Sequence, residues 1–200
     1  MLAKGDLEQE YGVDLRTITW VTRSNETAAF APEPGWKIEY KNADIDLGTM
    51  LARGEIDALF FSRAPSSLET GEVRRLFKNP KVACSDYYKK NGFFPIMHVI
   101  AIKNSVVEAN PSFPRQLLTI FEQSKSISEA YLDDPGWSQL PWARLAREEQ
   151  SSLIGLETWP IGFIKNKINI DRFIGYSFKQ DLIDRRISAE DLFHATVIDS

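Results

Sequence analysis

The chain has 200 residues, enough for one sizeable hydrophobic core or for two small lobes. Its apolar fraction of 43% and charged fraction of 26% are those of ordinary globular proteins. The net charge of −4, with both signs interspersed and no basic stripe, argues against a nucleic-acid-binding protein. The lone Cys84 excludes internal disulfides and cysteine-rich metal sites. No apolar run reaches the roughly 18 residues needed for membrane insertion.

The first predicted element is a helix over residues 1–11. Ala3, Leu7 and Tyr11 recur every four residues, and Gly12 supplies a left-handed C-terminal stop. No N-cap residue precedes this helix. We therefore expect the chain to begin within a longer fold, with any targeting sequence lying further upstream.

Residues 17–22 follow as a strand rich in β-forming side chains. Arg23, Asn25 and Glu26 come directly after it, at the edge of an α/β sheet where ligands bind. This polar loop is therefore a candidate ligand site. The alternative, which is the commoner outcome for a single loop, is a segment that is only solvated.

Residues 36–62 have the pattern of a βαβ unit. An alternating strand at 36–40 precedes a short helix with Asp44 or Asp46 as its N-cap, and a short apolar strand follows at 56–62. These two strands should be parallel and joined by a right-handed crossover.

Ser62 and Arg63 stand at the carboxyl end of that second strand. Arg63 is either a surface charge or a forked donor aimed at a ligand, and the residues alone leave both interpretations open. Two further helices are predicted at 72–77 and 84–90.

The stretch FFPIMHVIAI, residues 93–102, is the longest apolar run and predicts a strand buried on both faces. It carries His98. The imidazole is either neutral and satisfied by a backbone carbonyl, or it faces a ligand cleft. In a cleft, the ordinary imidazole pKa of about 6.5 suits proton transfer near neutrality.

The remainder of the chain is mainly helical in pattern, with helices predicted at 110–131, 142–153, 169–183 and 188–193. Asn110 is the expected cap of the first, and Ser188 with Asp191 forms a capping box for the last. The chain has no phosphate-binding Gly-rich loop, HExxH, CxxC or nucleophile elbow. Because His98 is distant from His194, which we expect at the surface, no histidine-based metal site is predicted.

A series of short motifs follows in order along the chain: GEIDA at 54–58, SRAP at 62–65, RLF at 75–77, GFFPIMHV at 92–99, LPW at 140–142, WPIG at 159–162 with Asn166, and YSFKQ at 176–180. This series resembles the 4,5-dihydroxyphthalate decarboxylase family. The resemblance extends through almost the whole chain. Ile161 and Phe178 depart from the family pattern, where tyrosine and an acidic residue are usual, and this leaves the substrate open.

The resemblance implies an α/β fold of the type II periplasmic-binding-protein kind, with a ligand held between two lobes. Residues 1–92 would form the core of the second lobe around a parallel or mixed sheet. Residues 93–103 would be the crossover or hinge strand, and residues 104–200 a mainly helical region packing on the first lobe. Because the N-terminal part of that first lobe would precede the chain, we expect helix faces to expose a large apolar patch.

The resemblance also implies a decarboxylation of a hydroxylated, phthalate-like acid that needs no organic cofactor in principle. The residue roles are hypotheses from position and chemistry. His98, with Glu26 as partner, would carry the proton transfers. Arg63 and Arg23 would clamp the substrate carboxylates. The further substrate-binding candidates are Ser62, Asn25 and Asn166.

The alternative is a solute-binding protein of the ABC-transporter type, because the same fold also binds small anions without chemistry. The same side chains would then hold a small carboxylated ligand that is not turned over. We expect the enzyme in the cytoplasm and the solute-binding protein in the periplasm. A third interpretation is an inactive fragment, which a homo-oligomer or a missing N-terminal segment would complete.

Overall fold

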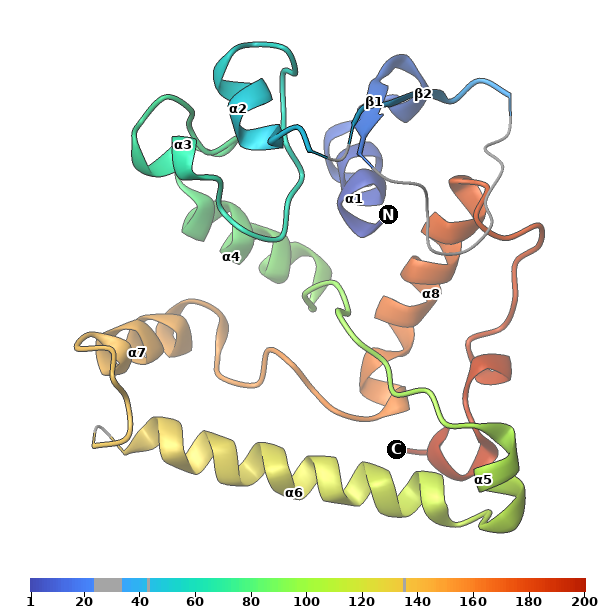
Figure 1. Cartoon of the computed structure of the whole chain (residues 1–200). Helices are drawn as coiled ribbons and strands as arrows, with labels where there is room; N and C mark the ends of the chain where they lie inside the picture. The colour runs from blue at the N-terminus through green and yellow to red at the C-terminus, as the bar shows by residue number, and fades with distance from the viewer. Residues whose placement is uncertain (24–33, 43, 135) are drawn as a thin grey trace. The chain divides into compact units, whose positions relative to one another are not determined.

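The computed structural model describes residues 1–23, 34–42, 44–134 and 136–200, which form two compact units. The first unit comprises Met1–Pro80 and Tyr176–Asp184, and the second comprises Lys81–Gly175 and Arg185–Ser200. Helices dominate both units, and the strands among the described residues form a two-stranded parallel sheet (Figure 1). The predicted α/β class is confirmed.

The elements fall into these units in chain order. The first unit contains α1 (Leu2–Tyr11), the 3-10 turn η1 (Leu15–Thr17), β1 (Thr19–Thr22), β2 (Lys37–Tyr40), α2 (Leu47–Ala52) and α3 (Ser66–Glu69). The second contains α4 (Pro80–Asn91, except its first residue), α5 (Asn104–Ala109), α6 (Phe113–Asp133), α7 (Ala143–Ile154), most of α8 (Phe163–Lys179), η2 (Glu190–Leu192) and η3 (Ala195–Val197). The last turn of α8 belongs to the first unit.

Helix α1 ends as its sequence predicts. Gly12 takes a left-handed backbone, with φ of 67°, which glycine adopts without the steric cost that a β-carbon brings. Its N–H donates to the carbonyl of Glu8, and the N–H of Val13 donates to that of Leu7. These bonds satisfy carbonyls that the helix end would otherwise leave unpaired.

Part of the core of the first unit lies where α1 meets the last turn of α8. Gly5 faces the ring of Tyr176, which is only 3% exposed. The hydroxyl of Tyr176 donates to Oδ1 of Asp6 at 3.0 Å. The amide of Gln180 donates to the carbonyl of Met1 at 3.1 Å. Two residues of the motif at 176–180 therefore hold α1 in place.

The sheet pairs strands other than those predicted. β1 and β2 run side by side in parallel, with Trp20 opposite Ile38 (Figure 1). Residues 56–62 are not a strand, and Phe60 and Phe61 are exposed. The predicted βαβ unit is therefore wrong. An apolar run becomes a strand only where a neighbouring strand pairs its backbone, and the described residues supply none here.

The N-cap of α2 is Asp46, one of the two residues predicted for this position. Its carboxylate accepts hydrogen bonds from the backbone N–H of Thr49 at 2.7 Å and from the Thr49 hydroxyl at 2.9 Å. The backbone bond is the main reason that the pKa of Asp46 lies below its usual value, and the charge of Arg23 contributes less. Helix α3 then docks on α2, because the buried hydroxyl of Ser67 donates to the carbonyl of Gly48 at 3.3 Å.

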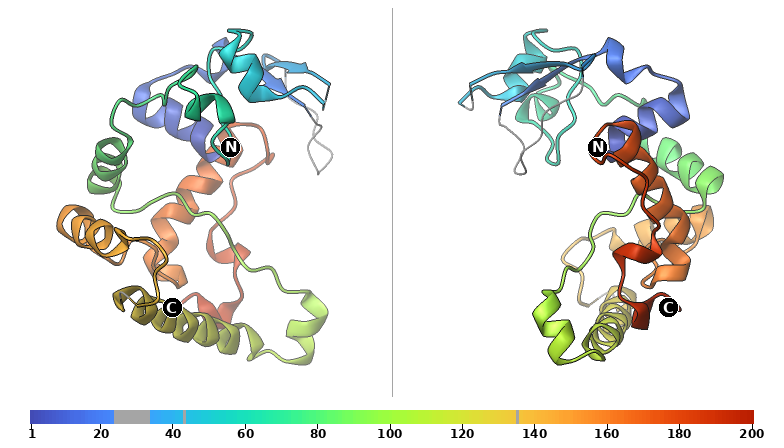
Figure 2. Two further views of the ribbon diagram at one scale, coloured as in Figure 1. Left: turned by 60° about the vertical axis from the view of Figure 1, so that its left-hand side comes forward. Right: turned by 90° about the vertical axis from the view of Figure 1, so that its right-hand side faces the viewer.

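In the second unit, α6 packs against the C-terminal turns. Both views of Figure 2 show the end of the chain beside α6, where Arg115 pairs with Asp199 at 2.8 Å. Ser200 in turn caps α8: its Oγ accepts from the N–H of Phe163 at 3.0 Å, and its main-chain oxygen accepts from the N–H of Ile164. Helix α8 therefore begins at Phe163 and not near residue 169 as predicted.

Other helix ends also differ from prediction. Asn110 does not cap α6: it accepts from the Ser112 hydroxyl in a turn, and α6 begins after Ser112. The expected capping box of Ser188 and Asp191 is replaced by a bond from the Ser188 hydroxyl to the Glu190 carboxylate. His194, predicted at the surface, is half-buried, and its Nδ1 accepts from the N–H of Thr196 at 3.3 Å.

Large apolar side chains of the second unit are exposed, as predicted for the C-terminal helices. Trp142 is 75% exposed and Leu140 72% exposed. Others on α6, on α7 and between them are Ile120, Phe121, Ile127, Tyr131, Leu132, Trp137, Leu145 and Leu153. Among the described residues of the second unit, no element buries these side chains.

Candidate functional site

Ser62 and Arg63 lie in the first unit, on the segment that leads into α3, and both are exposed. Arg63 forms no ion pair or hydrogen bond with another described residue. Its guanidinium is therefore open to an anion. The predicted partners Asn25 and Glu26 lie outside the described residues.

Arg23, at the end of β1, is half-buried, and its Nη1 donates to the carbonyl of Ile45 at 2.9 Å. Ile45 directly precedes Asp46, the N-cap of α2. The positive charge of Arg23 contributes to lowering the pKa of the Asp46 carboxyl. Arg23 thus joins the end of β1 to the start of α2. The bond to Ile45 therefore uses one of the N–H donors of the Arg23 guanidinium.

His98 lies in the second unit, in an extended segment at 94–103 that pairs with no described strand. The side chains from Met97 to Ile100 are exposed. The prediction of a strand buried on both faces is therefore wrong, and so is the interpretation of His98 as a buried imidazole. The ring forms no hydrogen bond with another described residue, so both nitrogens are open to a ligand.

Asn169 of α8 explains why this segment is extended without being a strand. Its Oδ1 accepts from the N–H of Ile96 at 3.0 Å, and its Nδ2 donates to the carbonyl of Phe94 at 2.7 Å. A carboxamide that donates and accepts in this way replaces two bonds of a neighbouring strand. Next to it, the guanidinium of Arg172 lies 4.8 Å from the ring centre of the buried Phe93.

Asn169 therefore anchors the start of the segment that carries His98. The sequence places Asn169 at the first position of a predicted helix and does not indicate this role directly. The available signal was an asparagine among the apolar positions of an amphipathic helix, where a polar group needs a partner.

Replacing Asn169 by leucine should destabilise the second unit by about 1–2 kcal/mol, because two half-buried backbone groups lose their partner. The direct measurement is amide hydrogen exchange at Ile96, which should become markedly faster. Asn166→Leu is the matched control and should leave that exchange unchanged. An Ile96 amide that stays protected in the Asn169 variant would contradict the anchoring role.

Asn166 has a different local task. Its Nδ2 donates to the carbonyls of Pro160 and Gly162 at 2.7 and 2.8 Å, and so closes the turn before α8. Asn166 and His98 lie in the second unit, whereas Arg23, Ser62 and Arg63 lie in the first.

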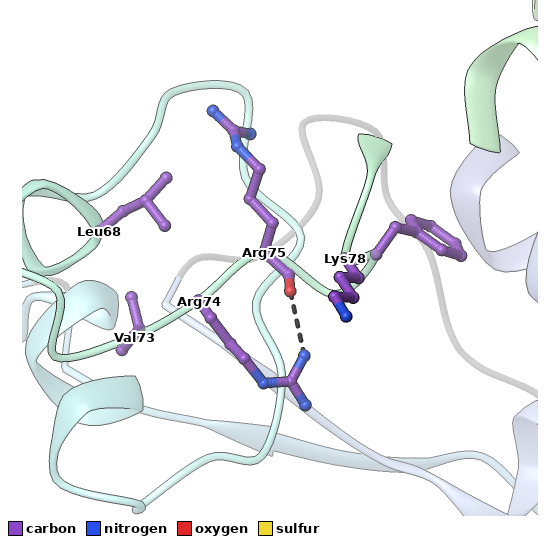
Figure 3. A pocket seen from close by; sticks show the side chains of 6 residues that line it. Leu68, Val73, Arg74, Arg75 and Lys78 are labelled. Atoms are coloured by element: carbon purple, nitrogen blue, oxygen red, sulfur yellow. Dashed lines mark hydrogen bonds between the residues drawn. The ribbon is translucent and has the colours of Figure 1, made fainter. Parts of the chain in front are cut away.

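The first unit contains a pocket that the sequence analysis did not predict. Its volume is about 590 Å³, and it is lined by Leu68, Val73, Arg74, Arg75, Phe77 and Lys78 (Figure 3). Such a volume lies within the roughly 300–1,000 Å³ of small-molecule sites. The predicted helix at 72–77 is wrong, because these residues form bends and irregular backbone. In this non-helical conformation several of them line the pocket.

The pocket segment is held at both ends within the first unit. The N–H of Val73 donates to the carbonyl of Ser67 at 3.2 Å, which ties the start of the segment to α3. The ring of Phe77 lies 5.6 Å from that of Tyr11, at the end of α1. These contacts position the apolar wall of the pocket.

Among the residues that the structure describes, no three His, Cys, Asp or Glu side chains gather where they could hold a metal ion. None of the described helices combines the length and the apolar character needed to cross a membrane.

Comparison with known proteins supports the motif analysis. The chain is 31% identical over 205 residues to a 4,5-dihydroxyphthalate decarboxylase of Comamonas testosteroni, an alignment that covers 97% of this chain and 62% of that protein. It is 32% identical over 91 residues to a 4,5-dihydroxyphthalate decarboxylase of Pseudomonas putida, covering 42% of this chain and 35% of that protein. The chain thus spans less than two thirds of the length of either relative.

No protein-family model matches the chain. The two curated relatives carry the same name, and the longer alignment includes nearly every residue of this chain. The chain is therefore similar to the 4,5-dihydroxyphthalate decarboxylases along almost its whole length, which confirms the family resemblance predicted from its motifs.

Proposed function

We propose that the protein decarboxylates a hydroxylated aromatic dicarboxylate of the 4,5-dihydroxyphthalate type. The observation that carries this proposal is the similarity to a named decarboxylase over 97% of the chain. Neither curated relative is named as a solute-binding protein, so the comparisons favour the enzyme over that alternative.

The chemistry requires an acid, a base and a cationic clamp. A base removes a proton from a ring hydroxyl, and the phenolate pushes electrons into the ring. An acid then protonates the ring carbon that bears the carboxylate. The bond to that carboxylate breaks, CO2 leaves, and the bonding electrons restore the aromatic ring. No organic cofactor enters this scheme.

His98, with Glu26 as its partner, is proposed for the proton transfers, and Arg63 with Arg23 for the carboxylates. The open ring of His98 and the open guanidinium of Arg63 support these roles. The remaining proposed substrate contacts are Ser62, Asn25 and Asn166.

The finer features of the fold belong to the same proposal. They are a periplasmic-binding-protein-like arrangement with a ligand cleft between two lobes, and a division of the chain at residues 1–92, 93–103 and 104–200. The family resemblance supports them.

The test is to incubate the full-length protein with a panel of hydroxylated aromatic acids and to measure released CO2. We expect release from 4,5-dihydroxyphthalate and none from phthalate, which has no ring hydroxyl to donate electrons. Tight binding of these acids without any release of CO2 would reject the enzyme and favour the solute-binding alternative.

A further inference from the structure

The extended segment at 94–103 is hydrogen-bonded at its two ends and not between them (Figure 1). From Met97 to Ile102, neither backbone nor side-chain groups form a hydrogen bond with another described residue. The backbone of Ile96 is bonded at one end, and the carbonyl of Lys103 accepts the first bonds of α5 at the other. His98 lies two residues past Ile96 and five before Lys103. Its position therefore depends mainly on the contacts at the start of the segment.

Aromatic packing holds the first residue of this segment in place. The ring of Phe94 lies 5.0 Å from that of Tyr88 on α4 and stacks on the ring of Trp159 at 5.5 Å. Apolar contact of this kind has little directional preference, so it leaves the following backbone free to rotate. These rings fix where the segment begins, but not the direction in which its later side chains point.

The carboxamide of Asn169 supplies that direction. Asn169 is only 4% exposed, and it bonds the carbonyl of Phe94 and the N–H of Ile96, at 2.7 and 3.0 Å. Pro95 lies between these two groups, and its ring fixes φ near about −65°. Two bonds that flank a residue of fixed φ leave the chain little freedom to turn about its own axis. Because alternate side chains of an extended chain share a face, the rotation set at Ile96 also directs the side chain of His98.

We propose that Asn169 is a positioning residue that orients the imidazole of His98 for proton transfer. It acts through the backbone of the segment and does not itself touch the imidazole. The proposal rests on the proposed function, in which His98 exchanges protons with the substrate. A general acid or base must lie within hydrogen-bonding reach of the proton that it moves, and a misplacement of about 1 Å can cost about a hundredfold in rate.

The experiment is a double-mutant cycle between Asn169 and His98. Asn169→Leu keeps the shape of the side chain without its polar groups, and Asn169→Ser is too short to reach both backbone groups. Each should lower kcat for 4,5-dihydroxyphthalate by about tenfold or more and leave KM unchanged. In the His98→Gln background, the same substitutions should lower kcat no further, because the group that they misplace is already absent.

Ser200→Ala is the matched control for a weakened α8. It removes the hydroxyl that accepts from the N–H of Phe163, and Ser200 forms no hydrogen bond with the segment at 94–103. Its kcat should equal that of the unaltered protein. If the Asn169 variants keep full kcat, or lose as much kcat in the His98→Gln background as in the unaltered one, the positioning role is overturned.

A measurement that needs no turnover separates this proposal from the proposed function. The backbone order parameter of His98, from ¹⁵N relaxation of the full chain, should fall in both Asn169 variants and stay unchanged in Ser200→Ala. Release of CO2 with a kcat that ignores Asn169 keeps the enzyme and removes the positioning role. If the unaltered protein releases no CO2 from any hydroxylated acid, the enzyme is removed and the order parameter decides. A lower value then keeps Asn169 as the residue that orients His98, and an unchanged value rejects it.

Discussion

Replacing His98 by glutamine should lower the turnover of 4,5-dihydroxyphthalate by at least about a hundredfold in the full-length protein. Glutamine keeps hydrogen-bonding groups of similar reach but cannot exchange a proton near neutrality. Because the side chain of His98 is exposed and forms no hydrogen bond with another described residue, this substitution should leave the fold intact. The measurement is kcat from CO2 release, together with an unfolding curve for each variant.

His194 provides the matched control for loss of an imidazole, since it is the second of two histidines in the chain. His194→Asn keeps an acceptor for the N–H of Thr196 and so preserves the start of η3. We expect its turnover to equal that of the unaltered protein. Equal turnover of the His98 and His194 variants would show that His98 carries no proton in the reaction.

Gly5→Ala should lower the free energy of unfolding by about 2 kcal/mol or more. A β-carbon at Gly5 would lie 2.2 Å from Cδ2 of Tyr176 and 2.3 Å from its Cγ, closer than any real contact. Overpacking of this kind costs about 1–3 kcal/mol and occasionally more. The higher helix propensity of alanine offsets at most about 1 kcal/mol of this loss in the free energy of unfolding. The ring of Tyr176 is buried and hydrogen-bonded to Asp6, so it cannot move aside cheaply.

The measurement is denaturant or thermal unfolding, with Gly175→Ala as the control. No atom lies within 4 Å of a β-carbon built at Gly175 beyond its own helix backbone. That substitution should therefore be neutral or stabilising by up to about 1 kcal/mol. If Gly5→Ala unfolds at the same midpoint as Gly175→Ala, the packing of α1 on Tyr176 is not as described.

Features that depend on a few neighbouring residues were predictable from the sequence. Gly12 ends α1 and Asp46 caps α2, because both act on backbone groups within about four residues of themselves. The family resemblance was also readable, since it depends on the order of short motifs. For the site, the sequence identified His98 and Arg63 as candidates by position and chemistry alone.

Features that depend on distant partners were decided by the tertiary structure. Ser200 sets where α8 begins, through a hydrogen bond to a residue 37 positions away in the sequence. Asn169 holds the segment before His98 through bonds to residues 73 and 75 positions away. The run at 56–62 did not become a strand, because its apolar side chains say nothing about which backbone will pair with it.

The pocket of Arg74, Arg75 and Lys78 follows the same principle. Its residues are neighbours in sequence, and the sequence predicts a helix at 72–77 and no pocket there. The bends between α3 and α4, held by Ser67 and by Tyr11, allow these residues to line the pocket. Local patterns therefore determined helix ends and family likeness, whereas pairing, burial and the pocket required the folded chain, because each depends on groups that local sequence does not specify.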